Sequence, residues 1–395
     1  MYKRLKDPIY GYIRVPIEYM TGIVDTAVFQ RLRRIIQTSY SPLYSSAVHN
    51  RFVHSLGVYH LGTIAANALR SEADNILEIE NKDIVLENLC KVFVLACLLH
   101  DVGHAPFSHT GEKLYLGENG DSSYTHIHQM LSDEIATESF RRDIPSGSGN
   151  AAPHEIMSAI VGLKAFSEYL SSSEDKEFFA RCITGYQYTK NDKESCLKNC
   201  FISLLNSKVI DVDKLDYLIR DAYITGFNTV SLDDAERKWI QNHPIVLYEC
   251  YILNHIFQHL NEQLNTEKDK LFSYQSLTKE GHMLKDNVKV SLLCDDDIVY
   301  IMKNIYSCET ELSKEYFERN SRRHPIWKSE AEYEAFISGA MGGQNDSMEA
   351  FEQAMTATAS YLTKASDTWK INDDTIENLN KELEMLETDI FDEDT

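Results

Sequence analysis

The sequence predicts a mainly α-helical protein with a few peripheral strands and a small α+β region near its C-terminus. Apolar residues recur at helical spacing along VDTAVFQRLRRIIQ, residues 24–37. Residues 84–100 are apolar on nearly every face, which is typical of a central, buried helix. Alternating patterns, which indicate strands, are confined to short stretches such as residues 9–15. Helices therefore dominate the predicted core.

The remaining elements follow in chain order. Helical spacing predicts further helices at residues 54–69, 154–166, 201–210, 211–223, 234–265 and 295–306. Gly, Ser and Pro at residues 143–153 predict a loop, and VKVSLLC at 288–294 predicts a strand. We divide the chain into a core over residues 1–280, a small α+β region over 281–371 and an acidic tail over 372–395.

Charge and cysteine usage exclude several classes of function. The formal net charge is −22, from 61 acidic and 39 basic residues. Nucleic acids and anionic membranes bind cationic surfaces, so we expect neither strong nucleic-acid binding nor membrane docking. No apolar run approaches the roughly 18 residues that a membrane-spanning helix needs. The eight scattered cysteines are typical of reduced thiols and predict a cytoplasmic protein.

The stretch LLHDVGHAPFSH, residues 98–109, concentrates ionisable groups at the end of the apolar helix. Successive helical residues are about 100° apart, so His100 and Asp101 point in adjoining directions. His104 covers the same face if the turn continues. Imidazole and carboxylate form a ligand pair suited to Fe, Mn, Zn or Ni and, less well, Mg. Burying such a pair without a partner would be costly, so a metal site is predicted.

Two further ligand candidates stand at the starts of other helices. They are His54, in HNRFVHSLG, and Asp213, in VIDVDKLDYLIRD. Each also has an ordinary structural interpretation, since a single His often begins a helix and an Asp there usually caps it. With His100 and Asp101 they would supply two His and two Asp from three helices. Such a set leaves positions open for water and substrate, as catalytic metal sites do.

The order H…HD…D resembles the signature of the HD-domain phosphohydrolases. The resemblance tightens to the deoxynucleoside triphosphate triphosphohydrolase branch and implies an HD-domain helical core. The matching pieces are DPIYGYI (7–13), FQRLRRIIQ (29–37), HNRFVHSLGV (49–58), LLHDVGHAPFSHTGE (98–112) and DVDKLDYLIRDAYITG (211–226). Their combination and order are far more specific than any one piece.

The resemblance implies that His54, His100, Asp101 and Asp213 are metal ligands. It also implies that water attacks the α-phosphorus of a dNTP, releasing the deoxynucleoside and intact tripolyphosphate. The implied cofactor is a divalent transition metal, Mn, Fe, Zn or Ni, with Mg accompanying the substrate phosphates. Members of the family commonly assemble into dimers, tetramers or hexamers, so a homo-oligomer is expected.

The resemblance also implies catalytic side chains. His104 and His109 are placed for proton transfer or phosphate contact, with Glu112 one turn beyond as an orienting carboxylate. A further active-site His of the family lies in an H-E-x-x-S pattern, which HEIMS matches better than YTHIH. We therefore predict His154 and keep His126 as the alternative. Taken alone, either is equally explained as a surface or loop His.

Substrate contacts are implied by position. Gln37 matches a sugar-side contact, and Arg51 matches a phosphate contact that suits its forked donors. Lys214 follows a ligand Asp and is expected to reach the phosphates. Tyr217 and Asp221 match residues that stack under the sugar and accept from its 3′-hydroxyl. Their ordinary alternatives are an aromatic of an amphipathic helix and a surface ion pair.

The pattern departs from the family after residue 228. RKWIQNHPIVLY provides Asn242 and His243, which fit substrate contacts, but Pro244 and Ile245 replace the usual His-Lys and Pro244 is expected to kink this helix. Asp234 stands where an Arg often binds the outer phosphates. Two other interpretations therefore stay open. One is an HD phosphohydrolase or phosphodiesterase acting on another nucleotide phosphate ester, and the other is a catalytically decayed nucleotide-sensing module.

Overall fold

The computed structural model describes residues 1–39, 41–76, 82–116, 120–145, 150–208, 210–225, 243–266, 270–305 and 311–318. All of them belong to one compact unit, Met1–His324, and the second unit, Pro325–Thr395, lies outside them. Most of the predicted α+β region and the whole acidic tail therefore fall outside the described residues. The division at residues 280 and 371 stays a prediction.

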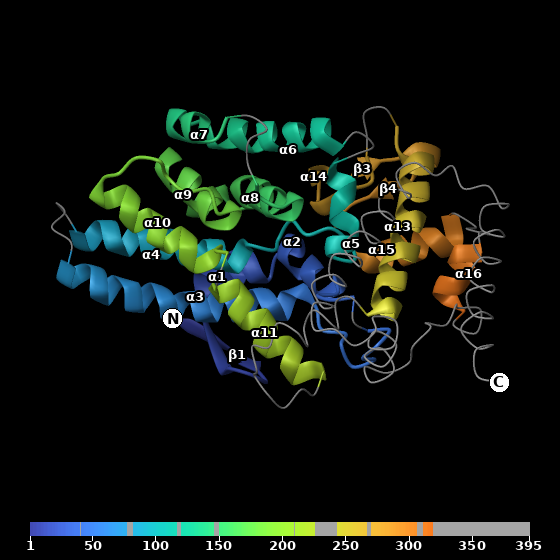
Figure 1. Cartoon of the computed structure of the whole chain (residues 1–395), viewed down its shortest axis with the longest axis horizontal. Helices are drawn as coiled ribbons and strands as arrows, with labels where there is room; N and C mark the ends of the chain where they lie inside the picture. Colours follow the sequence, from blue (N-terminus) through green and yellow to red (C-terminus); the bar gives the residue numbers. More distant parts are fainter. Residues whose placement is uncertain are drawn as a thin grey trace, which may run out of the picture. The chain divides into compact units, whose positions relative to one another are not determined.

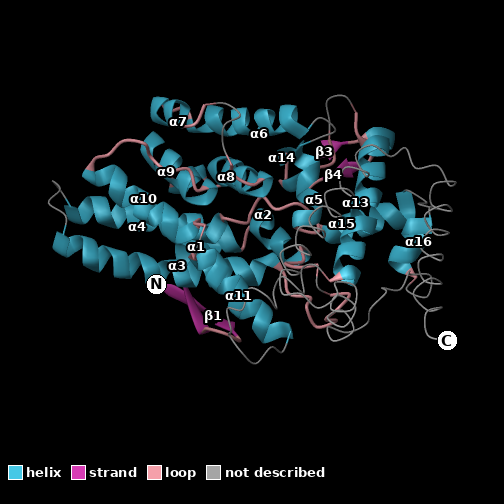
Figure 2. Ribbon diagram, viewed as in Figure 1, coloured by secondary structure: helices cyan, strands magenta, loops and turns pink. Residues whose placement is uncertain are grey.

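The mainly α class is confirmed (Figures 1 and 2). The longer helices are α3 (Arg51–Ile76), α4 (Lys82–Leu99), α6 (Gly120–Ile135), α8 (Pro153–Ala165), α9 (Ser173–Thr184), α10 (Lys193–Leu205), α11 (Val212–Thr225) and α13 (Pro244–Leu264). The short ones are α1 (Ile17–Tyr19), α2 (Ala27–Gln30), α5 (His109–Glu112), α7 (Glu138–Asp143), α14 (Tyr274–Leu277), α15 (Asp295–Tyr300) and α16 (Glu311–Phe317). The strands form two antiparallel hairpins, β1 (Tyr2–Asp7) with β2 (Gly11–Pro16) and β3 (His282–Met283) with β4 (Lys289–Val290).

The β1–β2 hairpin closes through a tight turn. Gly11 has a φ of 74°, a conformation that glycine adopts at little cost. The Asp7 carboxylate accepts hydrogen bonds from the amides of Ile9 (2.9 Å) and Tyr10 (3.0 Å). Ile13 and Val15 of β2 are buried, which anchors the hairpin to the helices. The turn is thereby held against the helical core.

Four long helices build the core around α4. Helix α4 packs against α3 and α9, α8 packs against α9, and α11 crosses α3 (Figure 1). Residues 95–99, at the end of α4, are almost completely buried, as the apolar pattern predicts. Fully burying one such aliphatic side chain stabilises the fold by about 1.5–3 kcal/mol. The end of α4 therefore delivers the next residues into the protein interior.

Two predicted elements are shorter than their patterns suggest. The helix predicted over residues 24–37 is α2 followed by a 3₁₀ turn, Arg31–Arg34, and the chain is extended at Ile35. Ile36 instead bridges to Asn50. The strand predicted over 288–294 is only two residues long, because the amides of its last part bond to the α14 region instead of a neighbouring strand.

The described residues after 280 pack onto the core. Leu293 is fully buried, and its carbonyl accepts a hydrogen bond of 2.9 Å from Nη1 of the buried Arg31. Nη2 of Arg31 donates to the Val102 carbonyl at 2.8 Å. One guanidinium thus joins the α15 region to the loop that follows α4.

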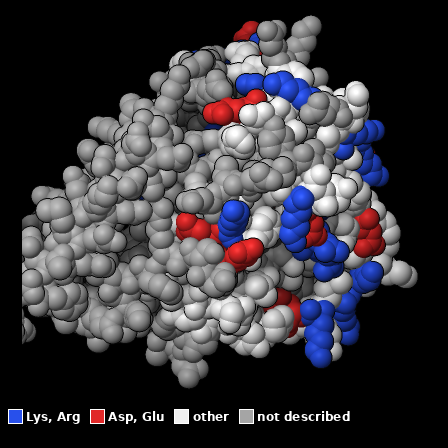
Figure 3. Space-filling model, turned by 90° about the vertical axis from the view of Figure 1, so that its right-hand side faces the viewer, with Lys and Arg blue, Asp and Glu red and all other residues white. Residues whose placement is uncertain are grey.

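The face of the molecule in Figure 3 carries exposed charges of both signs. On the face in Figure 3, the described Lys and Arg side chains lie among Asp and Glu side chains. Among the described residues, no helix combines the length and apolar character needed to cross a bilayer.

Candidate active site

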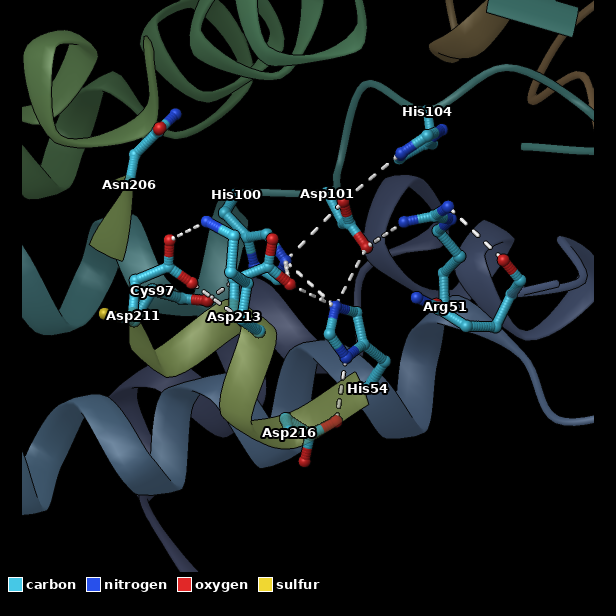
Figure 4. Close-up of polar contacts among 12 residues, drawn as sticks. Arg51, His54, Cys97, His100, Asp101, His104, Asn206, Asp211, Asp213 and Asp216 are labelled. Atoms are coloured by element: carbon cyan, nitrogen blue, oxygen red, sulfur yellow. Dashed lines mark hydrogen bonds and ion pairs between the residues drawn. The ribbon is translucent and has the colours of Figure 1, made fainter. Parts of the chain in front are cut away.

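Three helices bring the four predicted metal ligands together (Figure 4). His54 lies in the first turn of α3, His100 and Asp101 follow α4, and Asp213 lies in the first turn of α11. His54 Nε2 is 2.9 Å from Asp213 Oδ1 and 3.3 Å from His100 Nε2. Asp101 Oδ2 is 3.6 Å from His54 Nε2, and its Oδ1 is 3.5 Å from His100 Nε2. Asp213 Oδ1 is also 3.6 Å from His100 Nε2, so both carboxylates lie next to the same two imidazoles.

These residues fit a divalent transition metal. Atoms that bind one ion at about 2.0–2.2 Å lie about 3–3.5 Å from each other, close to the spacing seen here. Two imidazoles and two carboxylates form a mixed N/O set suited to Mn, Fe, Zn or Ni. His54 and Asp101 are buried, whereas the Asp213 side chain is 37% exposed. The site is thus closed on one side and open on the other.

The charges of the site favour a cation. Although burial opposes ionisation, Arg51 and the neighbouring imidazoles hold the pKa of Asp101 well below its usual range. His100 and His54 have the same effect on the pKa of Asp213. The two carboxylates Asp213 and Asp216 raise the pKa of His54 to about 10 despite its burial. A metal and a proton therefore compete for His54 Nε2, and metal binding at neutral pH would release that proton.

A buried carboxylate behind His54 sets the orientation of its ring. His54 Nδ1 donates to Asp216 Oδ2 at 2.8 Å, which leaves Nε2 directed at the other ligands (Figure 4). Asp216 also accepts from the Tyr10 hydroxyl at 2.8 Å and from Arg220 Nε at 2.9 Å. Metal-ligating imidazoles are commonly oriented by such a carboxylate. The sequence reasoning missed Asp216, although it stands one helical turn after Asp213.

A second group of side chains lies beside the first. The imidazole rings of His104 and His154 stack with their centroids 4.1 Å apart, and His109 lies 5.2 Å from His104. Glu112 hydrogen-bonds His154 Nδ1 and lies 3.2 Å from His109 Nδ1. His104 Nε2 is also 3.4 Å from Asp101 Oδ1. The structure thus places the predicted His154 with the other catalytic candidates, whereas His126 is exposed on α6.

The environments of His104 and His154 differ. Burial and the nearby cations hold the pKa of His104 well below its usual value, so its ring is neutral at pH 7. Burial also opposes charge on His154, but the hydrogen bond and charge of Glu112 raise its pKa overall. The same contacts lower the pKa of Glu112. The pKa values of the two adjacent imidazoles are therefore shifted in opposite directions, as in sites that separate an acid from a base.

A cavity of about 590 Å³ opens in front of both groups. A volume of this size is typical of small-molecule sites. It is lined by residues from both groups and by several predicted substrate contacts, among them His100, His109, His154, Asp213, Tyr217 and Asp221.

Three predicted polar contacts line this cavity, and two of them have defined neighbours. Gln37 is buried, and its Oε1 has no hydrogen-bond partner among the described residues. Asp221 Oδ1 lies 2.8 Å from Nε2 of the buried His49. Lys214 Nζ pairs with Asp211 Oδ2 at 2.7 Å and lines the cavity. Polar groups from α11 and from the extended segment after α2 thus face the same space.

Arg51, predicted as a phosphate contact, bonds the metal-ligand group. Its side chain is 3% exposed and is not among the residues that line the cavity. Nη1 donates to Asp101 Oδ2 at 2.7 Å, and Nε donates to Ser108 Oγ at 2.8 Å. The guanidinium therefore braces a metal-ligand candidate from behind.

Asn242 and His243 are the two substrate contacts predicted next to the start of α13. Asn242 lies outside the described residues. His243 is buried at the start of α13, where its Nδ1 accepts from the Ile245 amide at 3.2 Å. The expected kink at Pro244 is wrong, because Pro244 begins the helix, at a position where an amide proton is not needed.

Comparison with known proteins relates part of the chain to a known family. Residues 51–180 match the family model of the HD domain. This span contains three of the predicted metal ligands, His54, His100 and Asp101. The fold is similar to the crystal structure of a hypothetical protein from Aquifex aeolicus, with a TM-score of 0.50 and 22% identity over 81% of this chain and 76% of that one.

Individual related proteins show which branch of the family the chain resembles. The chain is similar to the deoxynucleoside triphosphate triphosphohydrolase SAMHD1 homolog of Dictyostelium discoideum (30% identity, covering 58% of this chain and 37% of that one). Human SAMHD1, named a deoxynucleoside triphosphate triphosphohydrolase, is 31% identical over 57% of this chain and 33% of its own. The uncharacterized protein YwfO of Bacillus subtilis is 30% identical, covering 57% of this chain and 40% of that one. The chain spans less than half the length of these relatives, and the resemblance to this branch is confirmed.

Proposed function

We propose that this protein is a metal-dependent phosphohydrolase that converts a deoxynucleoside triphosphate and water into a deoxynucleoside and tripolyphosphate. The main support is the convergence of His54, His100, Asp101 and Asp213 beside an open cavity that also contains an acid–base group. The named activity of the relatives supports the choice of substrate.

The proposed reaction breaks one bond and forms one. The oxygen of water attacks the α-phosphorus and the water gives up one proton to the solvent, the bond from phosphorus to the sugar 5′-oxygen breaks, and the triphosphate leaves intact. When bound, a divalent cation would lower the pKa of the attacking water and offset negative charge on the phosphate. The protonated His154 would donate its proton to the departing 5′-oxygen, and Glu112 would stabilise the charged ring before that transfer. A proton from the solvent then restores the donor imidazole.

The other cavity residues would hold the substrate. Lys214, on the wall next to Asp213, is the proposed phosphate contact. Gln37, Tyr217 and Asp221 are the proposed sugar contacts, and the unpartnered Gln37 Oε1 suits a hydroxyl donor. Arg51 would act by holding Asp101, which is a different role from the phosphate contact predicted by resemblance.

We further propose Mn, Fe, Zn or Ni as the resident ion, with Mg on the substrate phosphates. A cytoplasmic location is supported by the cysteines, since all those in the described part of the chain are free thiols. Assembly into a homo-oligomer is supported by the resemblance alone.

A nucleotide panel with product analysis tests the function. Purified protein is incubated with each dNTP in Mn, Mg, Zn, Fe or Ni, with and without other nucleotides as activators. We expect deoxynucleoside and tripolyphosphate in equal amounts. Asp101→Asn, which removes a ligand charge, should lower the rate by at least about 100-fold. Turnover of only a monophosphate or cyclic ester would replace this proposal with the alternative phosphohydrolase. No turnover of any ester would favour a nucleotide sensor.

A further inference from the structure

Asp295 links two loops that are far apart in the sequence. It is the first residue of α15, well beyond the matched HD region. Its Oδ2 accepts a hydrogen bond from the Ile36 amide at 2.8 Å, and its Oδ1 accepts one from the Phe107 amide at 2.6 Å. One carboxylate therefore satisfies two backbone donors on separate segments.

Both segments lead directly into the cavity. Gln37 follows Ile36, and His109 lies two residues after Phe107. The two segments are also joined to each other, because Ser108 Oγ donates to the Ile36 carbonyl. The carboxylate thus fastens a predicted sugar contact and a predicted catalytic imidazole to one point.

The second segment needs such an anchor. Phe107 has a φ of 56° and Ser108 a φ of 54°, and residues with side chains rarely adopt this region. Two such residues in sequence persist only where surrounding contacts hold them. Ser108 in turn receives Arg51 Nε at 2.8 Å, and Arg51 holds Asp101. The contacts of Asp295 therefore continue to the metal-ligand candidates.

The neighbouring aspartates of α15 have other tasks. Asp297 caps its own helix by accepting from the Cys294 amide at 2.9 Å. Asp296 is largely exposed and pairs with Arg34 at 3.0 Å. Asp295 alone of the three reaches across to the two loops, so helix capping does not explain its orientation.

We propose that Asp295 is a positioning residue that holds the Ile36–Gln37 and Phe107–His109 segments in the geometry needed for hydrolysis. The proposal rests on the proposed function for its activity readout only. If Asp295 has this role, the α15 region contributes to the geometry of the site although it lies outside the residues that match the HD family.

The test compares Asp295→Asn with two matched variants, Asp296→Asn and Asp297→Asn. Burial raises the pKa of Asp295 to about 7, so the assays are run above neutral pH, where the carboxylate is charged. Asn keeps the size of the side chain but offers one acceptor oxygen instead of two. We expect hydrogen exchange at Ile36 or Phe107 to become about tenfold faster in Asp295→Asn. We also expect kcat/KM to fall by about 100-fold.

The two controls separate positioning from stability. Asp296→Asn should leave both readouts unchanged, and Asp297→Asn should weaken α15 without changing kcat/KM by more than a few fold. Equal activity losses in Asp295→Asn and Asp297→Asn would overturn the proposal, as would unchanged exchange in Asp295→Asn. The exchange measurement needs no substrate, so it decides whether the carboxylate holds the loops even if the panel yields no dNTP turnover. Faster exchange with unchanged turnover of whichever ester the native protein hydrolyses would also overturn it.

Discussion

At the scale of single residues, Glu112 distinguishes the two stacked imidazoles. It bonds His154 and lies near His109, but it makes no such contact with His104. One carboxylate therefore raises the pKa of the His154 ring, while burial and nearby cations hold the pKa of the stacked His104 ring low. This difference makes His154 the better candidate for the proposed proton donor.

Glu112→Gln should move the alkaline limb of the pH–rate profile to lower pH. Activity needs the protonated His154, which is present below its raised pKa and lost as pH increases through that pKa. Without the charge of Glu112 that pKa falls, so activity is lost earlier on the alkaline side. Steady-state kcat measured across pH checks this result. Glu155→Gln removes another nearby charge that bonds Asn206 instead, and it should shift the limb less. An unchanged profile in Glu112→Gln would contradict the assigned acid.

At the scale of elements, the close approach of α3 and α11 shapes the metal-ligand group. Gly57 lies one turn after His54, and a Cβ there would come within 1.8 Å of Asp216 Oδ1. The missing side chain therefore creates room for the Asp216–Arg220 ion pair directly behind His54.

Gly57→Ala should consequently weaken metal binding as well as stability. Overpacking costs about 1–3 kcal/mol, and disturbing a carboxylate behind a ligand typically costs about 10–100-fold in metal affinity. Gly162→Ala is the matched control, since its Cβ would meet Phe179 Cζ at 2.5 Å, between α8 and α9. Denaturant unfolding and metal titration measure the two effects. Both variants should lose stability, but only Gly57→Ala should lose metal affinity. Equal affinities in the two variants would contradict this role of Asp216.

At the scale of the whole molecule, local patterns predict the helices and much of the site. The buried α4 and the HD pair at its end are visible as an apolar run that stops at two ionisable residues. The positions of His54 and Asp213 at helix starts are also local facts. That these two residues meet His100 and Asp101 in space is not a local fact. The sequence supports this convergence only through the resemblance to a known family.

Contacts between distant segments could not be predicted in this way. Asp295 bonds amides that are 259 and 188 residues away along the chain, and backbone donors leave no signature in the sequence. Arg51 matches a phosphate contact by its charge, and the sequence shows neither its burial nor its bond to Asp101. The helical spacing of Asp216 is equally typical of an ordinary amphipathic face. Tertiary packing, which decides these cases, is absent from any local pattern.

The shared cation can be located by anomalous scattering from crystals of the full chain grown with Mn. We expect one strong peak within about 2.0–2.3 Å of His54 Nε2, His100 Nε2 and carboxylate oxygens of Asp101 and Asp213. A peak held instead by the three imidazoles of His104, His109 and His154, which also lie close enough to bind an ion, would contradict the assignment. So would the absence of any peak from a protein that hydrolyses nucleotides in Mn.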